Sequence, residues 1–183
     1  MGVKDITFAN LPVKGYPYGI CSTPTLYYLA QYDFDLAVSV TASHNSGEYV
    51  GMKFVDRNVE LLSTEFLRQL FEDFYVEGTH TKSFPYVKIE HQRLIAEKLK
   101  KLTDFLMEKR GTLGKRYTFV VDFSNGAGIT FEKQFFQQLA DTHTIIFIND
   151  QPDGTFSAHE SDTSVNKNYT QLVQKVQESG ADF

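Results

Sequence analysis

Short, mainly apolar runs are the clearest pattern along the chain. They occupy residues 36–40 (LAVSV), 117–123 (YTFVVDF) and 144–148 (TIIFI). Runs of this length, rich in β-branched and aromatic residues and without helical spacing, are typical of buried strands. A weaker run predicts a short strand over residues 4–9. Both halves of the chain therefore contain candidate strands of a sheet.

Apolar residues at intervals of three and four predict helices between these strands. The first helix begins at Ser22-Thr23-Pro24, where Thr23 can cap it and Pro24 suits its first position, and it runs to about residue 32. Ser63 or Thr64 can cap the second helix. Further helices are predicted over residues 87–110, after Gly128, and over residues 169–178, with Gly180 ending the last. In the second helix the apolar positions fall on one face: Phe66, Leu67, Leu70, Phe71 and Phe74. In the helices after Gly128 and over residues 169–178 the positions expected to face the core are Phe131, Phe135, Phe136, Leu139, Leu172, Val173 and Val176.

The order of the predicted elements indicates an α/β protein. Residues 51–54 and 59–62 flank Asp56-Arg57-Asn58, a good turn for a hairpin. From residue 117 onward, strand, loop and helix alternate. Such an order predicts parallel strands with right-handed crossovers.

Composition and charge narrow the classes of function. Lysine and arginine number 18, aspartate and glutamate number 23, and the net charge is −5. A dispersed, slightly acidic charge argues against nucleic acid or a membrane surface as a partner. No apolar run approaches the ~20 residues that a membrane span needs, and no signal peptide is expected. Cys21, as the one cysteine, fits a reducing compartment, so we expect a soluble protein of the cytoplasm.

Polar residues gather directly after the first apolar run. Residues 41–47 read TASHNSG, a cluster typical of a loop at the carboxyl end of a strand. Ligands of open α/β sheets bind at that edge. Ser43 and His44 lie in this cluster, and Lys53 follows Ser43 by ten positions. The cluster is therefore the main candidate for a catalytic site.

These residues resemble a known family. T-A-S-H-N, followed by G-E-Y-x-G-x-K-F, is similar to the phosphoserine loop of the α-D-phosphohexomutases, the phosphoglucomutase/phosphomannomutase superfamily. Ser46 stands where the family usually has proline, and Val50 where it usually has asparagine. V-V-D-x-x-N-G-A-G at residue 120 and P-D-G-x-F-x-x-H at residue 152 resemble the family's second domain. The resemblance covers nearly the whole chain.

The resemblance implies two consecutive three-layer α/β/α domains with mainly parallel, mixed sheets. Domain I would comprise residues 1–112, lacking its first strand, and domain II residues 113–183. It also implies a phosphoserine at Ser43 that exchanges its phosphoryl group with a hexose phosphate through a bisphosphorylated sugar. His44 and Lys53 would be catalytic, Thr41 and Asn45 would support the loop or contact substrate, and Mg²⁺ would bind Ser43 through its phosphate.

Other parts of the family's pattern are not found in this sequence. They include the D-G-D-x-D-R loop with three metal-binding aspartates, the sugar-recognition loop and the phosphate-binding domain. We therefore expect the chain to be a piece of a mutase and to show no appreciable mutase activity by itself. A first domain without its first strand would expose a sheet edge, and self-association through that edge is expected.

Simpler explanations and alternative functions remain open at this point. Ser43 could hydrogen-bond its own loop, His44 could be a solvated side chain, and Lys53 a surface charge. The fold could also serve a non-catalytic binding domain, or Ser124-Asn125-Gly126 could form a nucleotide-binding turn, although a tight βα turn is the preferred interpretation. Neither the remaining histidines, which lack ligand spacing for zinc, nor the loop acids is expected to form a separate site. These residues are His80, His91, His143, His159, Asp153, Glu160 and Asp162.

Overall fold

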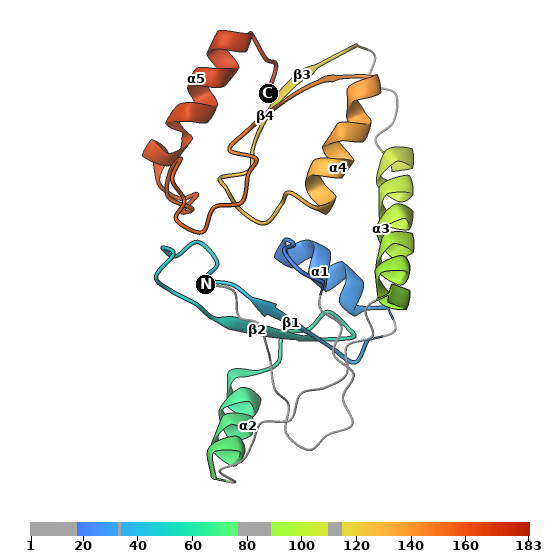
Figure 1. Cartoon of the computed structure of the whole chain (residues 1–183), viewed down its shortest axis with the longest axis vertical. Coiled ribbons are helices and arrows are strands. Elements are labelled where there is room, and N and C mark those ends of the chain that lie inside the picture. The colour runs from blue at the N-terminus through green and yellow to red at the C-terminus, as the bar shows by residue number, and fades with distance from the viewer. Residues whose placement is uncertain (1–17, 33, 77–88, 110–114) are drawn as a thin grey trace.

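A computed structural model describes residues 18–32, 34–76, 89–109 and 115–183, which form a mixed α/β fold. One group of elements contains α1, β1, β2 and α2, and a second contains β3, α4, β4 and α5, with the long helix α3 beside them (Figure 1). The bounds are α1 Thr23–Ala30, β1 Leu36–Val40, β2 Met52–Asp56, α2 Thr64–Val76, α3 Ile89–Lys109, β3 Thr118–Asp122, α4 Phe131–Gln138, β4 Thr144–Ile148 and α5 Thr170–Ser179. Short 3₁₀ turns, η1 Leu139–Asp141 and η2 Asn166–Tyr169, follow α4 and precede α5.

The first group is an antiparallel strand pair covered on one face by α1. β1 pairs with β2 so that Val38 lies opposite Phe54. Ala30, Ala37 and Val55 form the buried cluster, and Val55 is fully inaccessible. The predicted strand over residues 36–40 is confirmed residue for residue.

The predicted hairpin around Asp56-Arg57-Asn58 is only partly present. The main partner of β2 is β1. Beyond the turn, pairing is reduced to one bridge between Val55 and Leu61. The Asp56 carboxylate accepts the backbone N–H groups of Asn58 and Glu60, both at 2.9 Å. The side chain thus competes with regular strand pairing over this segment.

Both caps in the first group come from serines. Ser22 caps α1, since its hydroxyl accepts the Thr25 N–H at 3.3 Å, so the predicted cap at Thr23 is one residue too late. Ser63 caps α2 by accepting the Phe66 N–H at 3.1 Å, as one of the two predicted alternatives.

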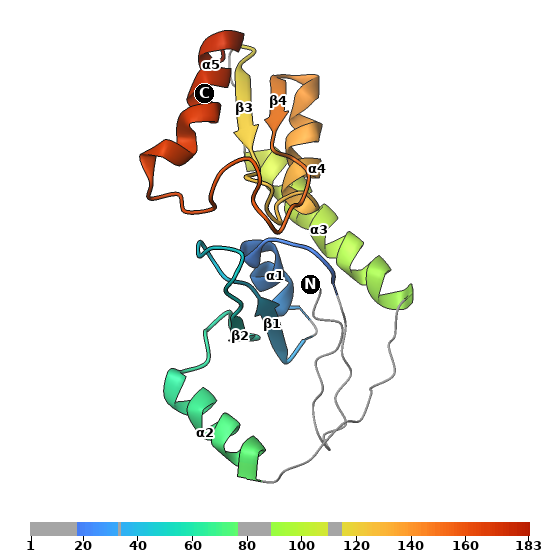
Figure 2. The same ribbon diagram turned by 60° about the vertical axis from the view of Figure 1, so that its left-hand side comes forward.

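The apolar side of α2 is exposed in this structure. Phe66, Leu70 and Phe71 are 56%, 48% and 41% exposed. Figure 1 and Figure 2 both show α2 apart from the other helices. The helix with the predicted apolar spacing is therefore present, and within the described part of the chain these three residues of its apolar face are not buried.

The second group is built on parallel strands, as predicted. β3 and β4 pair in parallel with Val120 opposite Ile146. Phe183 continues this sheet on the other edge of β3, because the Val120 N–H donates to the Phe183 carbonyl at 2.8 Å. Gly180 ends α5 with φ +63°, a left-handed conformation suited to glycine. Val173, predicted to face the core, is 51% exposed instead.

A carboxylate joins the two groups. Glu132, in the first turn of α4, accepts hydrogen bonds from the hydroxyls of Ser22 and Thr25, the latter at 2.7 Å. Ser22 is the cap of α1, so one side chain ties the starts of two helices. α3 contributes the Lys98 ammonium, which lies 4.3 Å from the centre of the Tyr32 ring.

The remaining predictions about the fold meet the limits of the described residues. The predicted strand over residues 4–9 and the domain boundary near residues 111–114 lie outside them, as do Val87 and Arg110 at the ends of the predicted long helix. Within the described ranges, no helix is long and apolar enough to cross a membrane.

Candidate active site

The loop that follows β1 is closed at its base by backbone hydrogen bonds. The Thr41 N–H donates to the Gly51 carbonyl at 2.9 Å, and the Gly51 N–H returns a bond to Thr41 at 3.1 Å. The residues between them, 43–50, are exposed. The antiparallel pairing of β1 and β2 thus projects this segment, the Ser43 loop, away from the sheet.

Ser43 has a strained backbone at an exposed position. Its φ is +60°, in the left-handed region that residues other than glycine rarely adopt. Its N–H donates to the Thr41 hydroxyl at 2.9 Å, and its own hydroxyl lies 3.5 Å from Nδ1 of His44. The two predicted side chains are therefore neighbours, and Thr41 supports Ser43 directly.

Lys53 lies on β2, and the strand register places it opposite Ser39. It is half-buried. Within the described residues, no hydrogen bond or ion pair joins Lys53 to Ser43. The structure thus brings Thr41, Ser43 and His44 together and leaves Lys53 on the adjoining strand.

Residues of the second group contact the Ser43 loop from outside. The Ser161 hydroxyl lies 3.2 Å from the carbonyl oxygen of His44 and 3.3 Å from that of Asn45. Gly47 approaches Gly154 so closely that a Cβ atom on Gly47 would lie 2.5 Å from the Gly154 carbonyl oxygen. Both contacts join segments far apart in the sequence, so residues from both halves of the chain contribute to the site.

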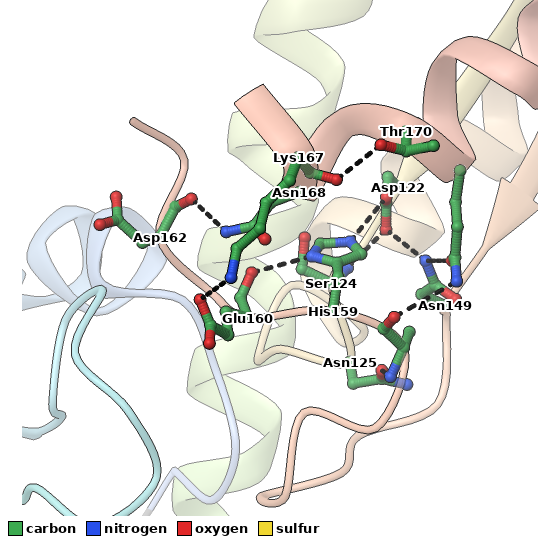
Figure 3. A network of polar contacts seen from close by, with 12 residues as sticks. Asp122, Ser124, Asn125, Asn149, His159, Glu160, Asp162, Lys167, Asn168 and Thr170 are labelled. Carbon is green, nitrogen blue, oxygen red and sulfur yellow. Dashed lines mark hydrogen bonds and ion pairs between the residues drawn. The ribbon is translucent and has the colours of Figure 1, made fainter. Parts of the chain in front are cut away.

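A polar network lies at the end of β3 and includes His159, two residues before Ser161 in the sequence (Figure 3). Asp122 Oδ2 lies 3.0 Å from Nε2 of His159, and Asp122 Oδ1 accepts the Ser124 N–H and the Asn149 amide. The side chains of Asp122 and His159 are only 8% and 12% exposed. Nδ1 of His159 lies 2.8 Å from the Glu160 carbonyl, which can only accept, so this nitrogen carries a proton.

The pKa of His159 is raised above its ordinary value of 6.5. Burial lowers this pKa, but the hydrogen bond to the Glu160 carbonyl and the pairing with the Asp122 carboxylate outweigh burial. His159 therefore forms a buried ion pair with Asp122 when it is protonated.

This raised pKa predicts a pH dependence of stability. The contribution of protonated His159 is fully present below pH 6.5, the unfolded value, and is lost as pH rises through the raised folded value. Replacing His159 with glutamine should remove this contribution to stability. We expect the difference in unfolding free energy between wild type and His159→Gln, measured with urea in pH steps, to narrow with rising pH. A difference that stays constant across this range would contradict the ion pair.

The glycine-rich segment after β3 forms a tight βα turn, which is the interpretation preferred from the sequence over a nucleotide-binding turn. Ser124 and Asn125 have φ of +50° and +53°. The side-chain amide of Asn125 donates to the Gln151 carbonyl at 2.9 Å, and its oxygen accepts the Ala158 N–H at 3.3 Å. Asn125 thus binds the turn to the loop after β4.

The loop acids form turns, as predicted. The Asp153 carboxylate accepts the Thr155 N–H at 2.9 Å, and the Asp162 carboxylate accepts the Ser164 N–H at 2.8 Å. Ser164 and the nearby His44 lower the pKa of Asp162. Glu160 pairs with Lys167 at 3.1 Å, with both side chains exposed.

A metal ion is not accommodated by the described residues alone. Over the described ranges, no group of three or more His, Cys, Asp or Glu side chains is suited to hold one. Ser43 could contribute a single ligand through a phosphate, whereas Mg²⁺ requires near-octahedral oxygen coordination. These residues do not fit a Mg²⁺ site, and we derive no chemical step through the ion.

Two features of this site were missed by the sequence reasoning. One is the Asp122–His159 pair, and the other is the contact from Ser161. A usable signal existed for the first, since Asp122 lies near the end of the strand predicted over residues 117–123 and His159 ends the P-D-G-x-F-x-x-H motif. Nothing in the local sequence distinguishes Ser161 from other loop serines.

Comparison with known proteins supports the resemblance. A family model described as "Phosphoglucomutase/phosphomannomutase, alpha/beta/alpha domain I" matches residues 7–78. The chain is 30% identical to a phosphomannomutase of Methanocaldococcus jannaschii over 167 residues, 90% of this chain and 36% of that protein. It is 31% identical to a phosphoglucosamine mutase of Methanococcus aeolicus over 157 residues, 84% of this chain and 34% of that protein.

The fold is also similar to a solved structure, a phosphoglucomutase/phosphomannomutase family protein from Burkholderia thailandensis. The TM-score is 0.73 at 21% sequence identity, over 92% of this chain and 36% of that one. This chain thus spans little more than a third of the length of the relatives that it matches.

Proposed function

Because this chain belongs to the phosphohexomutase superfamily, we propose that it carries a phosphoryl group on Ser43 and exchanges it with a hexose phosphate. The complete reaction would interconvert hexose 1-phosphate and 6-phosphate through a bisphosphorylated sugar. The observation that carries the proposal is Ser43 itself, an exposed serine held in a left-handed conformation at the end of a strand. Strained residues of this kind are concentrated at functional sites.

The transfer step assigns roles to the residues around Ser43. The bond between phosphorus and Ser43 Oγ breaks as a sugar hydroxyl oxygen bonds to phosphorus; that hydroxyl gives up its proton, and the departing Ser43 Oγ takes up one proton to become a hydroxyl again. His44, beside the Ser43 hydroxyl, would orient the phosphate. Thr41 supports the Ser43 backbone, Asn45 would brace the loop through its N–H bond to the Ala42 carbonyl, and Lys53 would supply positive charge from β2. Mg²⁺ at the phosphate stays a prediction on which no step here depends.

We also propose that the two groups of elements correspond to two domains, residues 1–112 and 113–183, each of α/β/α type. The antiparallel β1–β2 pair with α1 and the parallel β3–β4 pair with α4 and α5 support this division. In this arrangement the Ser43 loop belongs to the first domain, and Ser161 and His159 belong to the second.

The test is phosphate uptake by the chain. Incubation with α-D-glucose 1,6-bisphosphate should add one phosphoryl group, seen by intact-mass spectrometry, and peptide mapping should locate it on Ser43. A phosphate on any other residue would end the assignment. If sugar phosphates bind without any phosphate uptake, the alternative of a non-catalytic binding domain is favoured.

A further inference from the structure

Ser161 makes an unusual contact with the Ser43 loop. Its hydroxyl reaches two backbone carbonyls, those of His44 and Asn45, which are the residues immediately after Ser43. A hydroxyl has a single proton, so the two carbonyls share one donor. The contact is to main chain rather than to side chains, and it therefore constrains the path of the loop.

The Ser43 loop has little internal support against which to hold a strained residue. Its hydrogen bonds are few: the Ser43 N–H bonds to Thr41 Oγ1, the Asn45 N–H bonds to the Ala42 carbonyl at 3.1 Å, and the Tyr49 N–H bonds to the Ser46 carbonyl at 3.1 Å. The side chains from residue 43 to residue 50 are exposed. A left-handed serine persists only where its surroundings fix it, and Ser161 supplies such a constraint from outside the loop.

Ser161 is itself held from both sides. Before it, His159 is paired with Asp122 at the end of β3. After it, the Asp162 carbonyl accepts the side-chain amide of Asn168 at 2.7 Å, and Asn168 is only 5% exposed. Both anchors are buried: Asp122 lies at the end of β3 and Asn168 lies in the turn that precedes α5, and Figure 3 shows both contacts. The residues on either side of Ser161 are therefore held in place.

We propose that Ser161 is a positioning residue for Ser43, holding the phosphate-carrying loop in its strained conformation from the second half of the chain. This inference rests on the proposed function for its catalytic consequence, although the loop contact can be measured without it. The Gly47–Gly154 approach is a second contact between the same two segments and supports the same alignment.

The experiment compares Ser161→Thr with Ser161→Val in the full 183-residue chain. The two side chains have nearly the same shape, and only threonine keeps the hydroxyl; Ser161→Ala is the simple deletion. One readout is hydrogen–deuterium exchange of the peptide covering residues 41–51. The other is the rate of Ser43 phosphorylation by α-D-glucose 1,6-bisphosphate.

We expect the valine and alanine variants to exchange about five- to tenfold faster in this peptide and to phosphorylate Ser43 more slowly by a similar factor, as for the loss of one hydrogen bond. The threonine variant should restore both. Exchange at wild-type rate in the alanine variant would overturn the inference, as would equal behaviour of the threonine and valine variants. If wild type takes up no phosphate while the alanine variant exchanges faster, the proposed function is wrong and the loop contact stands.

Discussion

Replacing Ser43 with alanine should lower phosphate uptake from α-D-glucose 1,6-bisphosphate by at least about 10³-fold, because the variant lacks the only oxygen proposed to bond to phosphorus. The Thr41 hydroxyl would still accept the backbone N–H of residue 43, but Nδ1 of His44 would lose the hydroxyl beside it. The measurement is intact-mass spectrometry over a time course, with wild type run beside the variant.

Two further variants separate chemistry from loop conformation. Ser43→Gly relieves the backbone strain of φ +60° but, like Ser43→Ala, lacks the hydroxyl. It should therefore be as inactive as Ser43→Ala. Ser46→Ala removes another exposed hydroxyl of the same loop and should retain uptake. Uptake at wild-type rate in either Ser43 variant, or its loss in Ser46→Ala with Ser43 intact, would refute the role given to Ser43.

The second large effect concerns stability. Asp122→Ala should lower the free energy of unfolding by about 3 kcal/mol, because removing one partner of a buried ion pair leaves the other charge without compensation. The same carboxylate also accepts the Ser124 N–H at 2.8 Å and the Asn149 amide at 3.0 Å. Ser124 would lose this acceptor, whereas the Asn149 amide would keep its second bond, to Gln171 Oε1 at 3.0 Å. Urea unfolding followed by circular dichroism at pH 6 measures the change.

Asp35 offers a matched control. Its carboxylate pairs with Arg57, but the side chain is 92% exposed. Asp35→Ala removes an equal charge and an ion pair in water, and should leave the free energy of unfolding close to that of wild type. Equal losses in the two variants would show that burial of the Asp122–His159 pair has no special importance.

The strands could be predicted from sequence where residues of one kind follow one another. Residues 36–40 and 144–148 are apolar or β-branched except for Ser39, and both strands are confirmed at those bounds. The helix cap was misplaced by one residue because Ser22 and Thr23 both carry hydroxyls, and only the extended backbone of Ser22 allows the bond. The second strand of the hairpin was predicted too long, since the Asp56 side chain takes up the backbone donors of the turn.

The site could be predicted only where it is local. Thr41, Ser43 and His44 are close together in the sequence, and their position in a loop after a strand follows from it. The His159–Asp122 pair joins residues 37 positions apart, and the Ser161–His44 contact joins residues 117 apart. Such pairings depend on the path of the loop after β4, for which a single sequence holds no periodic signal.

Glu132 imposes a rule on recombination between relatives. A chimera with its crossover in residues 110–114 would take Ser22 and Thr25 from one parent and the acid from the other. If one parent had an apolar residue at position 132, the hydroxyls of Ser22 and Thr25 would lose their shared acceptor. If the other parent had apolar residues at positions 22 and 25, the Glu132 carboxylate would lose both of its donors. Viable hybrids should therefore inherit this triad as a unit, even though its members lie on opposite sides of the crossover.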